Sequence, residues 1–148
     1  MGPYKRILCP IDFSGYAAVA LREAAALAKG MGAELTLIHA YQNPAYVLPM
    51  SGYVGPTADM ITKMRQQIGD ELAGLAADVR KQGLTVQTQV IEGIPYKCIV
   101  DHASEWKADL IVMGTHGRTG LSHALTGSVA ERVVRTAQCP VLITRGHD

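Results

Sequence analysis

Aromatic and charged side chains are scarce in this chain of 148 residues, which has one Trp, one Phe and 18% charged residues. Its 14 basic and 13 acidic residues leave it without the basic footprint of a nucleic-acid binder, and few rings are present for bases to stack on. No apolar run approaches the roughly 18 residues that span a membrane. We therefore expect neither nucleic acid nor membrane among its partners.

Cysteine is also rare, and its spacing does not suggest a metal site. Cys9, Cys98 and Cys139 form no CxxC or Cys/His pattern, so reduced thiols of a cytosolic protein are expected. Cys9 and Cys139 lie in apolar runs and are predicted to be small core residues. The opening residues are too short for a secretory leader, and Arg6 stands where myristoylation needs Ser or Thr. We expect a soluble, cytoplasmic protein.

Apolar runs alternate with helical patterns along the whole chain. Strands are predicted at 5–11, 34–40, 84–91, 109–113 and 140–144, and helices after Ser14, through the stripe from Met60 to Val79, and over 95–106 and 128–136. Such alternation favours one α/β domain over residues 1–148, with a parallel sheet covered by helices on both faces. Ligands of these sheets bind beyond the carboxyl ends of the strands.

Several local signals refine this outline. Ser14 is a predicted N-cap, and Gly30 and Gly32 should end the first helix. We expect two helical stripes to face the core: Ala17, Leu21, Ala24 and Ala28, and then Met60, Met64, Ile68, Leu72, Leu75 and Val79, closed by Gly83. The alternation over 84–91 indicates a strand at a sheet edge. Residues 42–57, rich in Pro and Gly, predict a long loop that is functional or mobile.

The segment from Gly114 to Ser128 carries the clearest chemical signal. Its glycines let the backbone approach a ligand closely, so that successive N–H groups can surround phosphate oxygens. The helix predicted to begin at Ser128 adds the positive end of its dipole. A Walker motif would need Gly-Lys-Ser/Thr here, and the Gly-x-Gly-x-x-Gly dinucleotide spacing is absent. By themselves the glycines are a weak phosphate signal.

Their spacing is more specific. Gly114, Gly117 and Gly127, followed by Ser128, resemble the ATP-binding signature of the universal stress protein family. Further similarity to the family lies in residues 6–14, 37–40, 109–114 and 139–143, so that the resemblance covers nearly the whole chain. It implies a five-stranded parallel sheet with strand order 3-2-1-4-5 and helices on both faces, of the adenine-nucleotide alpha-hydrolase type.

The resemblance also implies a binding site for ATP or AMP. Pro10 and Asp12 would lie near the adenosine end, and the backbone of Ala40 would face adenine. Met113 and Gly114 would line the ribose. The phosphates would be held by the loop and the start of the helix, through Thr115, His116, Gly117, Arg118, Gly120, Gly127, Ser128 and Val129. Any Mg²⁺ would be held mainly by the phosphates themselves.

Several of these residues have alternative interpretations. Asp12 could cap the first helix or its turn, and Ser128 with Glu131 forms a Ser-x-x-Glu capping box. Arg118 could pair with phosphate or face solvent, and the same holds for His116. His39 ends a strand and is predicted to be packed or hydrogen-bonded.

The leading functional hypothesis is a binding module whose nucleotide-occupied state is read by an unidentified regulatory partner. A slow ATPase or phosphotransferase is an alternative, although residues 114–128 contain no Asp or Glu to hold Mg²⁺. A nucleotide-independent interaction protein is a second alternative, against which the intact glycine signature argues. An ATP pyrophosphatase would need Ser-Gly-Gly-x-Asp-Ser after the first strand, where this chain has Asp12-Phe-Ser-Gly-Tyr.

The last predicted strand, 140–144, has implications for assembly. It is apolar along its length, and in the implied strand order it lies at a sheet edge. Exposed apolar edges invite pairing unless they are covered. We expect a homodimer in which two copies of this strand pair about a two-fold axis, as members of the resembled family commonly do.

Overall fold

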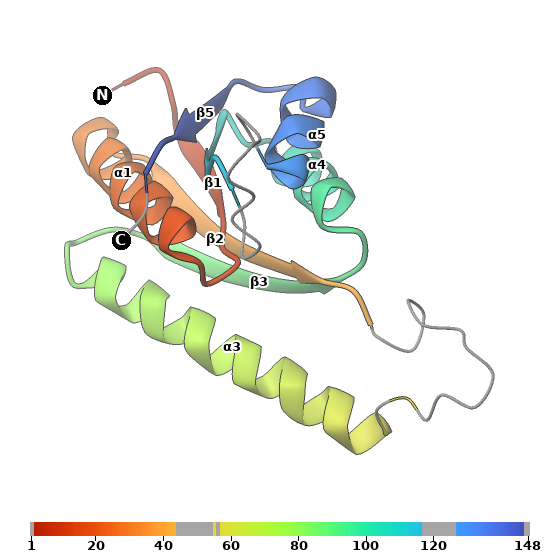
Figure 1. Ribbon diagram of the computed structural model, residues 1–148. Helices are drawn as coiled ribbons and strands as arrows, with labels where there is room; N and C mark the ends of the chain where they lie inside the picture. The colour runs from red at the N-terminus through yellow and green to blue at the C-terminus, as the bar shows by residue number, and fades with distance from the viewer. Residues whose placement is uncertain (1, 44–54, 56, 117–126, 147–148) are drawn as a thin grey trace.

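The computed structural model describes residues 2–43, 55, 57–116 and 127–146. Within them, five parallel strands form one sheet in the order β3-β2-β1-β4-β5, as expected (Figure 1). The strands are β1 (Arg6–Pro10), β2 (Glu34–Tyr41), β3 (Val86–Glu92), β4 (Leu110–Gly114) and β5 (Val141–Thr144). Strand order runs from β1 through β2 to β3 on one side and through β4 to β5 on the other, so it reverses between β1 and β4.

Helices cover both faces of this sheet (Figure 1). The described helices are α1 (Gly15–Met31), α3 (Ala58–Arg80), α4 (Pro95–Trp106) and α5 (Ser128–Thr136). Alternate residues of β1 divide the core: Ile7 and Cys9 pack with α1 and α3, whereas Leu8 packs with α4 and α5. The near-continuous apolar runs predicted as central strands are therefore buried on both faces, as parallel strands usually are.

The ends of α1 follow the local sequence signals. Ser14 Oγ accepts a hydrogen bond from the Ala17 N–H at 3.1 Å, so the predicted N-cap is confirmed. At the other end Gly32 has a φ of 67°, the left-handed conformation that ends many helices and that glycine adopts without a Cβ clash. Gly30, which was also expected to end this helix, lies inside it.

The stripe predicted along α3 is correct only in its second half. Leu72 and Val79 are buried and Leu75 packs against the core, but Met60 at the start of the helix is 58% exposed. In Figure 1 the amino-terminal part of α3 extends beyond the sheet, so its apolar residues have less sheet to cover. The helix ends at Arg80, before the predicted Gly83.

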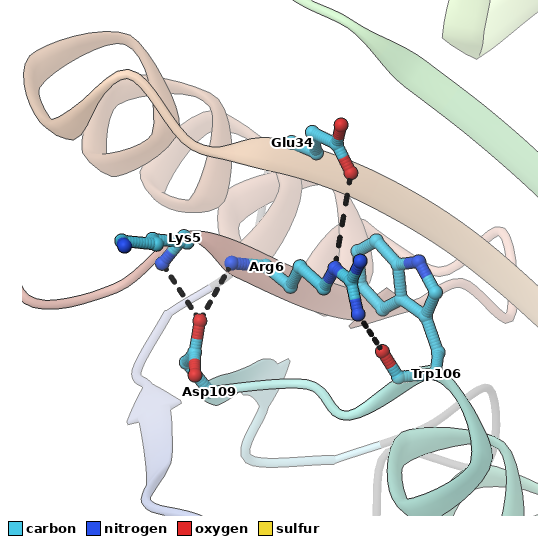
Figure 2. A network of polar contacts seen from close by, with 5 residues as sticks. All are labelled: Lys5, Arg6, Glu34, Trp106 and Asp109. Carbon is cyan, nitrogen blue, oxygen red and sulfur yellow. Dashed lines mark hydrogen bonds and ion pairs between the residues drawn. The ribbon is translucent and has the colours of Figure 1, made fainter.

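The amino ends of the central strands are joined by polar contacts (Figure 2). Asp109, just before β4, accepts hydrogen bonds through Oδ2 from the backbone N–H groups of Lys5 at 2.8 Å and Arg6 at 2.9 Å. The Arg6 guanidinium donates to the Trp106 carbonyl at 2.8 Å and lies over the indole ring, 5.9 Å from its centroid. Glu34 Oε2 lies 4.0 Å from Arg6 Nε. These contacts tie the starts of β1, β2 and β4 to the end of α4.

Both outer strands match the edge positions expected for them. β3 lies beside β2 alone and β5 beside β4 alone in the described sheet. Leu142 of β5 is 37% exposed, which agrees with an apolar strand at an edge. No helix in the described part of the chain is long and apolar enough to cross a membrane.

Two sequence predictions fall largely or wholly outside the described residues. These are the long loop predicted over 42–57, most of which lies at 44–54 and 56, and the phosphate contacts assigned to Gly117, Arg118 and Gly120.

Candidate functional site

A cavity opens at the carboxyl ends of β1, β2 and β4, on the face of the sheet that carries α4 and α5. Its volume is about 150 Å³, and further space lies at its open mouth. Its lining includes seven residues predicted from the sequence: Pro10, Asp12, Ala40, Met113, Gly114, His116 and Val129. The fold therefore brings together residues that are up to 119 positions apart in the chain (Val129 and Pro10).

The position of this cavity follows from the topology. The neighbouring strands β1 and β4 are followed by helices on different faces of the sheet, because α1 packs on one face and α5 on the other. Such a switch point is the usual ligand site of an open parallel sheet.

The turn between β1 and α1 forms one wall. Asp12 Oδ1 accepts hydrogen bonds from the Ser14 N–H at 3.0 Å and the Ser14 hydroxyl at 2.5 Å. The capping interpretation of Asp12 is thus correct, and its carboxylate lines the cavity as well. Both hydrogen bonds from Ser14 go to Oδ1, so neither of them occupies Oδ2.

This turn is also strained. Phe13 has a φ of 64°, a left-handed conformation that costs a bulky residue about 1 to 3 kcal/mol. Its ring lies 5.0 Å from that of His39, whose Nδ1 donates to the Ile11 carbonyl at 2.6 Å. The prediction that His39 is packed or hydrogen-bonded is therefore confirmed, and its contacts stabilise the turn between β1 and α1.

The end of β4, which lies beside β1 in the sheet, forms another part of the lining. A Cβ added at Gly114 would lie 2.8 Å from the Tyr16 carbonyl oxygen, so this position needs glycine for close contact with α1. The Thr115 N–H donates to the Thr144 carbonyl at 3.0 Å, and the Thr115 carbonyl accepts from the Gly127 N–H. Thr115 and Gly127, which flank most of the glycine-rich segment, are thus joined at the end of β4.

The amino ends of α4 and α5 both reach the cavity, through Pro95 and Val129. The predicted Ser128–Glu131 capping box is wrong: Gly127 is the N-cap, and no side chain of the described residues caps the helix. Glu131 instead pairs with Arg135 of the next turn at 2.8 Å. Because glycine has no side chain to offer, the first N–H groups of α5 receive no cap from it and remain suited to an anion.

His116 follows directly after the buried Thr115. Its Nδ1 is buried, and among the described residues it has no hydrogen-bond partner. The ring stands edge-on to Tyr16, with 5.2 Å between ring centroids. Of the two interpretations left open by the sequence, full exposure to solvent is therefore wrong.

The thiols offer no ready nucleophile beside this cavity. Burial raises the pKa of Cys9, in β1, to about 12, so it stays a neutral core residue, as predicted. Cys139 is half-buried against the α4–α5 side of the core, and burial raises its pKa as well. In the described part of the chain no three His, Cys, Asp or Glu side chains gather as metal ligands.

Comparison with known proteins agrees with this geometry. The sequence profile of the Universal stress protein family matches residues 3–145. This chain belongs to the universal stress protein family. It is 39% identical to Universal stress protein MJ0531 of Methanocaldococcus jannaschii over 147 residues, which cover 96% of this chain and 82% of that protein.

Solved structures of universal stress proteins share its fold. MJ0577 of the same archaeon superimposes with a TM-score of 0.83 at 28% identity, covering 98% of both chains. A universal stress protein in complex with cAMP gives 0.72 at 25% identity, over 97% of this chain and 98% of the other. The protein from Archaeoglobus fulgidus in complex with dAMP gives 0.66 at 27% identity, over 95% and 97%.

Not every predicted residue of this universal stress protein lines the cavity. Thr115 is buried, Gly127 and Ser128 lie at the start of α5, and none of the three is part of the lining. Conversely, the sequence reasoning missed five lining residues: Ile11, Ala17, Ile38, Pro95 and Ile99. The apolar ones gave only core signals, but the predicted start of a helix at Pro95, after a parallel strand, could have indicated a second helix end at the site.

Proposed function

We propose that this universal stress protein is an adenine-nucleotide-binding module that holds ATP or AMP in the cavity at the carboxyl ends of β1, β2 and β4. The observation that carries this proposal is the convergence of seven predicted residues on one cavity at the switch point of the sheet. Relatives bound to cAMP and dAMP support an adenine nucleotide as the ligand.

The charges around the cavity favour one orientation of the nucleotide. The Asp12 carboxylate would repel phosphate and suits the nucleoside, whereas the start of α5, which no described side chain caps, attracts an anion. Adenine would lie by the backbone of Ala40, and ribose by Met113 and Gly114. The phosphates would meet the glycine-rich segment and α5, with any Mg²⁺ held through the phosphates.

In this proposal the bound nucleotide is a signal that a regulatory partner reads in the cytoplasm. Among the described residues that line the cavity, Asp12 alone carries a carboxylate. A phosphotransferase uses a carboxylate near the phosphates to hold a metal ion or orient a nucleophile. In the proposed orientation Asp12 lies at the nucleoside end instead, so the cavity favours binding over turnover.

Titration calorimetry of the purified chain with adenosine, AMP and ATP tests the site. Ala40→Leu places three extra carbons in the cavity and should weaken all three ligands by at least about tenfold. Ala77→Leu, on the exposed side of α3, is the matched control and should leave the affinities unchanged. A wild-type protein that binds no adenine nucleotide, or an Ala40→Leu protein that binds normally, would refute the proposal.

We also propose that the protein is a homodimer paired through β5. Leu142 is 37% exposed on this edge strand, and Val134 on neighbouring α5 is 51% exposed. Leu142→Lys should produce monomers or aggregates, measured by light scattering, whereas Gln87→Lys on the opposite edge strand should not. A wild-type monomer at micromolar concentration would contradict this assembly.

A further inference from the structure

A groove lies between α1 and the carboxyl end of α3, on the face of the sheet that carries these two helices. Its volume is about 350 Å³, more than twice the 150 Å³ of the nucleotide cavity and within the range of small-ligand sites. The α1 side is lined by small residues, Ala17, Ala18 and Ala25, whose short side chains leave this space open. Protein interiors are otherwise close-packed, so a space of this size calls for an explanation.

The chemistry of the walls favours an uncharged, largely apolar molecule. Leu75 and Val79 line the groove from α3, whereas Arg22, Asp78 and Gln82 are its exposed polar residues. Because Arg22 and Asp78 carry opposite charges, neither an anion nor a cation gains a clear net attraction. The Gln82 amide can donate and accept hydrogen bonds, so it suits a single polar group on the ligand.

The groove is too small to hold a helix from a partner protein. One helical turn about 10 Å wide and 5.4 Å long occupies roughly 420 Å³. This exceeds the volume of the groove, which is about 350 Å³. A small molecule is therefore the occupant that fits.

The turn between β1 and α1 belongs to both the groove and the nucleotide cavity. Asp12 lines the cavity, and the next two residues, Phe13 and Ser14, line the groove. Ser14 donates two hydrogen bonds to the Asp12 carboxylate, so a displacement of Ser14 moves a group that faces the nucleotide. Phe13 has the strained φ of 64°, which persists only where its surroundings hold it. A molecule packed against Phe13 and Ser14 would hold the turn in this conformation.

We infer that the groove between α1 and α3 binds a small, uncharged, apolar molecule, and that its occupation strengthens nucleotide binding through the β1–α1 turn. The coupling rests on the proposed nucleotide-binding function and adds a regulatory site to it. Couplings between binding sites are reciprocal, so the nucleotide strengthens binding in the groove by the same factor. A coupling at the lower end of the usual range changes each affinity about fivefold.

Methyl NMR of the wild-type protein with 2-naphthol, an uncharged aromatic molecule with one hydroxyl, tests the site. The methyl resonances of Leu75 and Val79 should shift, whereas those of Ile99, which lines only the nucleotide cavity, should not. Ala18→Leu fills the groove and should abolish these shifts. Ala77→Leu, the same change on the exposed side of α3, should retain them. Shifts at Ile99 alone, or undiminished binding by Ala18→Leu, would overturn the inference.

Calorimetric titration with AMP, with and without saturating 2-naphthol, measures the coupling. The AMP affinity should rise about fivefold in the wild type and in Ala77→Leu, but not in Ala18→Leu. An AMP affinity that is unchanged or lower when the groove is occupied would overturn the coupling. If AMP did not bind at all, the proposed function and the coupling would fail together, and the methyl shifts would still decide whether the groove is a ligand site.

Discussion

Polar groups are paired with one another at the amino ends of the central strands, whereas at the carboxyl ends they face a cavity. At the amino ends, the Asp109 carboxylate accepts from the backbone of Lys5 and Arg6, and the Arg6 guanidinium donates to the Trp106 carbonyl (Figure 2). At the carboxyl ends, Asp12 and His116 face a cavity, and the Nδ1 of His116 has no partner in the described part of the chain. Phe13 adds a strained backbone there.

This difference separates stability from binding. Polar groups that satisfy one another hold the strands in register, and they have little left to offer a ligand. Unsatisfied groups and strain lower stability, and they persist where the surrounding structure holds them and a ligand can use them. We therefore expect changes at the amino ends to alter unfolding, and changes at the carboxyl ends to alter affinity.

The largest effect is expected from Asp109→Ala. The backbone N–H groups of Lys5 and Arg6 would lose a charged acceptor, so the free energy of unfolding should fall by about 2 kcal/mol. Asp109→Asn keeps an acceptor oxygen and should lose less. Urea denaturation measures both, and AMP affinity should stay unchanged. A marked loss of affinity in a folded Asp109→Asn protein would break the proposed separation.

Asp12→Ala is the corresponding change at the carboxyl ends. It removes a side chain that lines the cavity at the nucleoside end, so the affinities for adenosine and ATP should both fall by about tenfold. Asp12→Asn keeps the acceptor for Ser14 and isolates the effect of charge. Calorimetry gives the affinities, and thermal melting should show a smaller loss of stability than Asp109→Ala. A loss of affinity for ATP alone would mean that Asp12 lies at the phosphate end, opposite to the proposed orientation of the nucleotide.

Thr36→Val tests whether an unpaired polar atom is by itself a mark of function. Thr36 is 1% exposed, and its hydroxyl also lacks a partner among the described groups, but it does not line the cavity. Replacing this hydroxyl with a methyl group should raise the free energy of unfolding by about 1 kcal/mol, with unchanged nucleotide affinity. Destabilisation in urea would mean that the hydroxyl has a partner in solution.

The smallest effect concerns pH. His102 stacks on Trp106 near the amino ends, and burial lowers its pKa, against an opposing effect of Glu105. Its proton therefore binds more readily in the unfolded chain, so stability should fall as pH drops from about 6.5 toward the lowered pKa. His102→Gln should reduce this slope in denaturation curves recorded between pH 7 and 5. An identical slope in both proteins would exclude His102 as the source.

Much of the fold could be predicted because its signals are local. Ser14 caps α1, Pro95 begins α4, and the apolar run that enters β4 is buried, since each depends on a few neighbouring residues. The stripe on α3 was predicted less well. Helical spacing shows that Met60 shares a face with Leu72, but the spacing cannot show where the underlying sheet ends.

The candidate site divides in the same way. Seven of the residues that the family resemblance implies for a nucleotide site line one cavity, and their contacts with a nucleotide stay a prediction. Local patterns gave the wrong cap for α5. Ser128 and Glu131 satisfy the capping pattern, yet Gly127 is the N-cap, because its carbonyl accepts the first hydrogen bond of the helix, from the Glu131 N–H.

By itself, the sequence determined the order and kinds of the elements, the alternation that makes a parallel sheet, and the glycine spacing of the family, because these depend on neighbours along the chain. Only the tertiary structure decided that Asp12 and His116 line one cavity. It also decided that the backbone of Tyr16 lies too close to Gly114 for a residue with a Cβ. It also decided that, among the described residues, Arg6 and Asp109 form hydrogen bonds whereas the Nδ1 of His116 forms none. Such pairings depend on distances between segments about 100 residues apart, which crossover geometry and core packing set together.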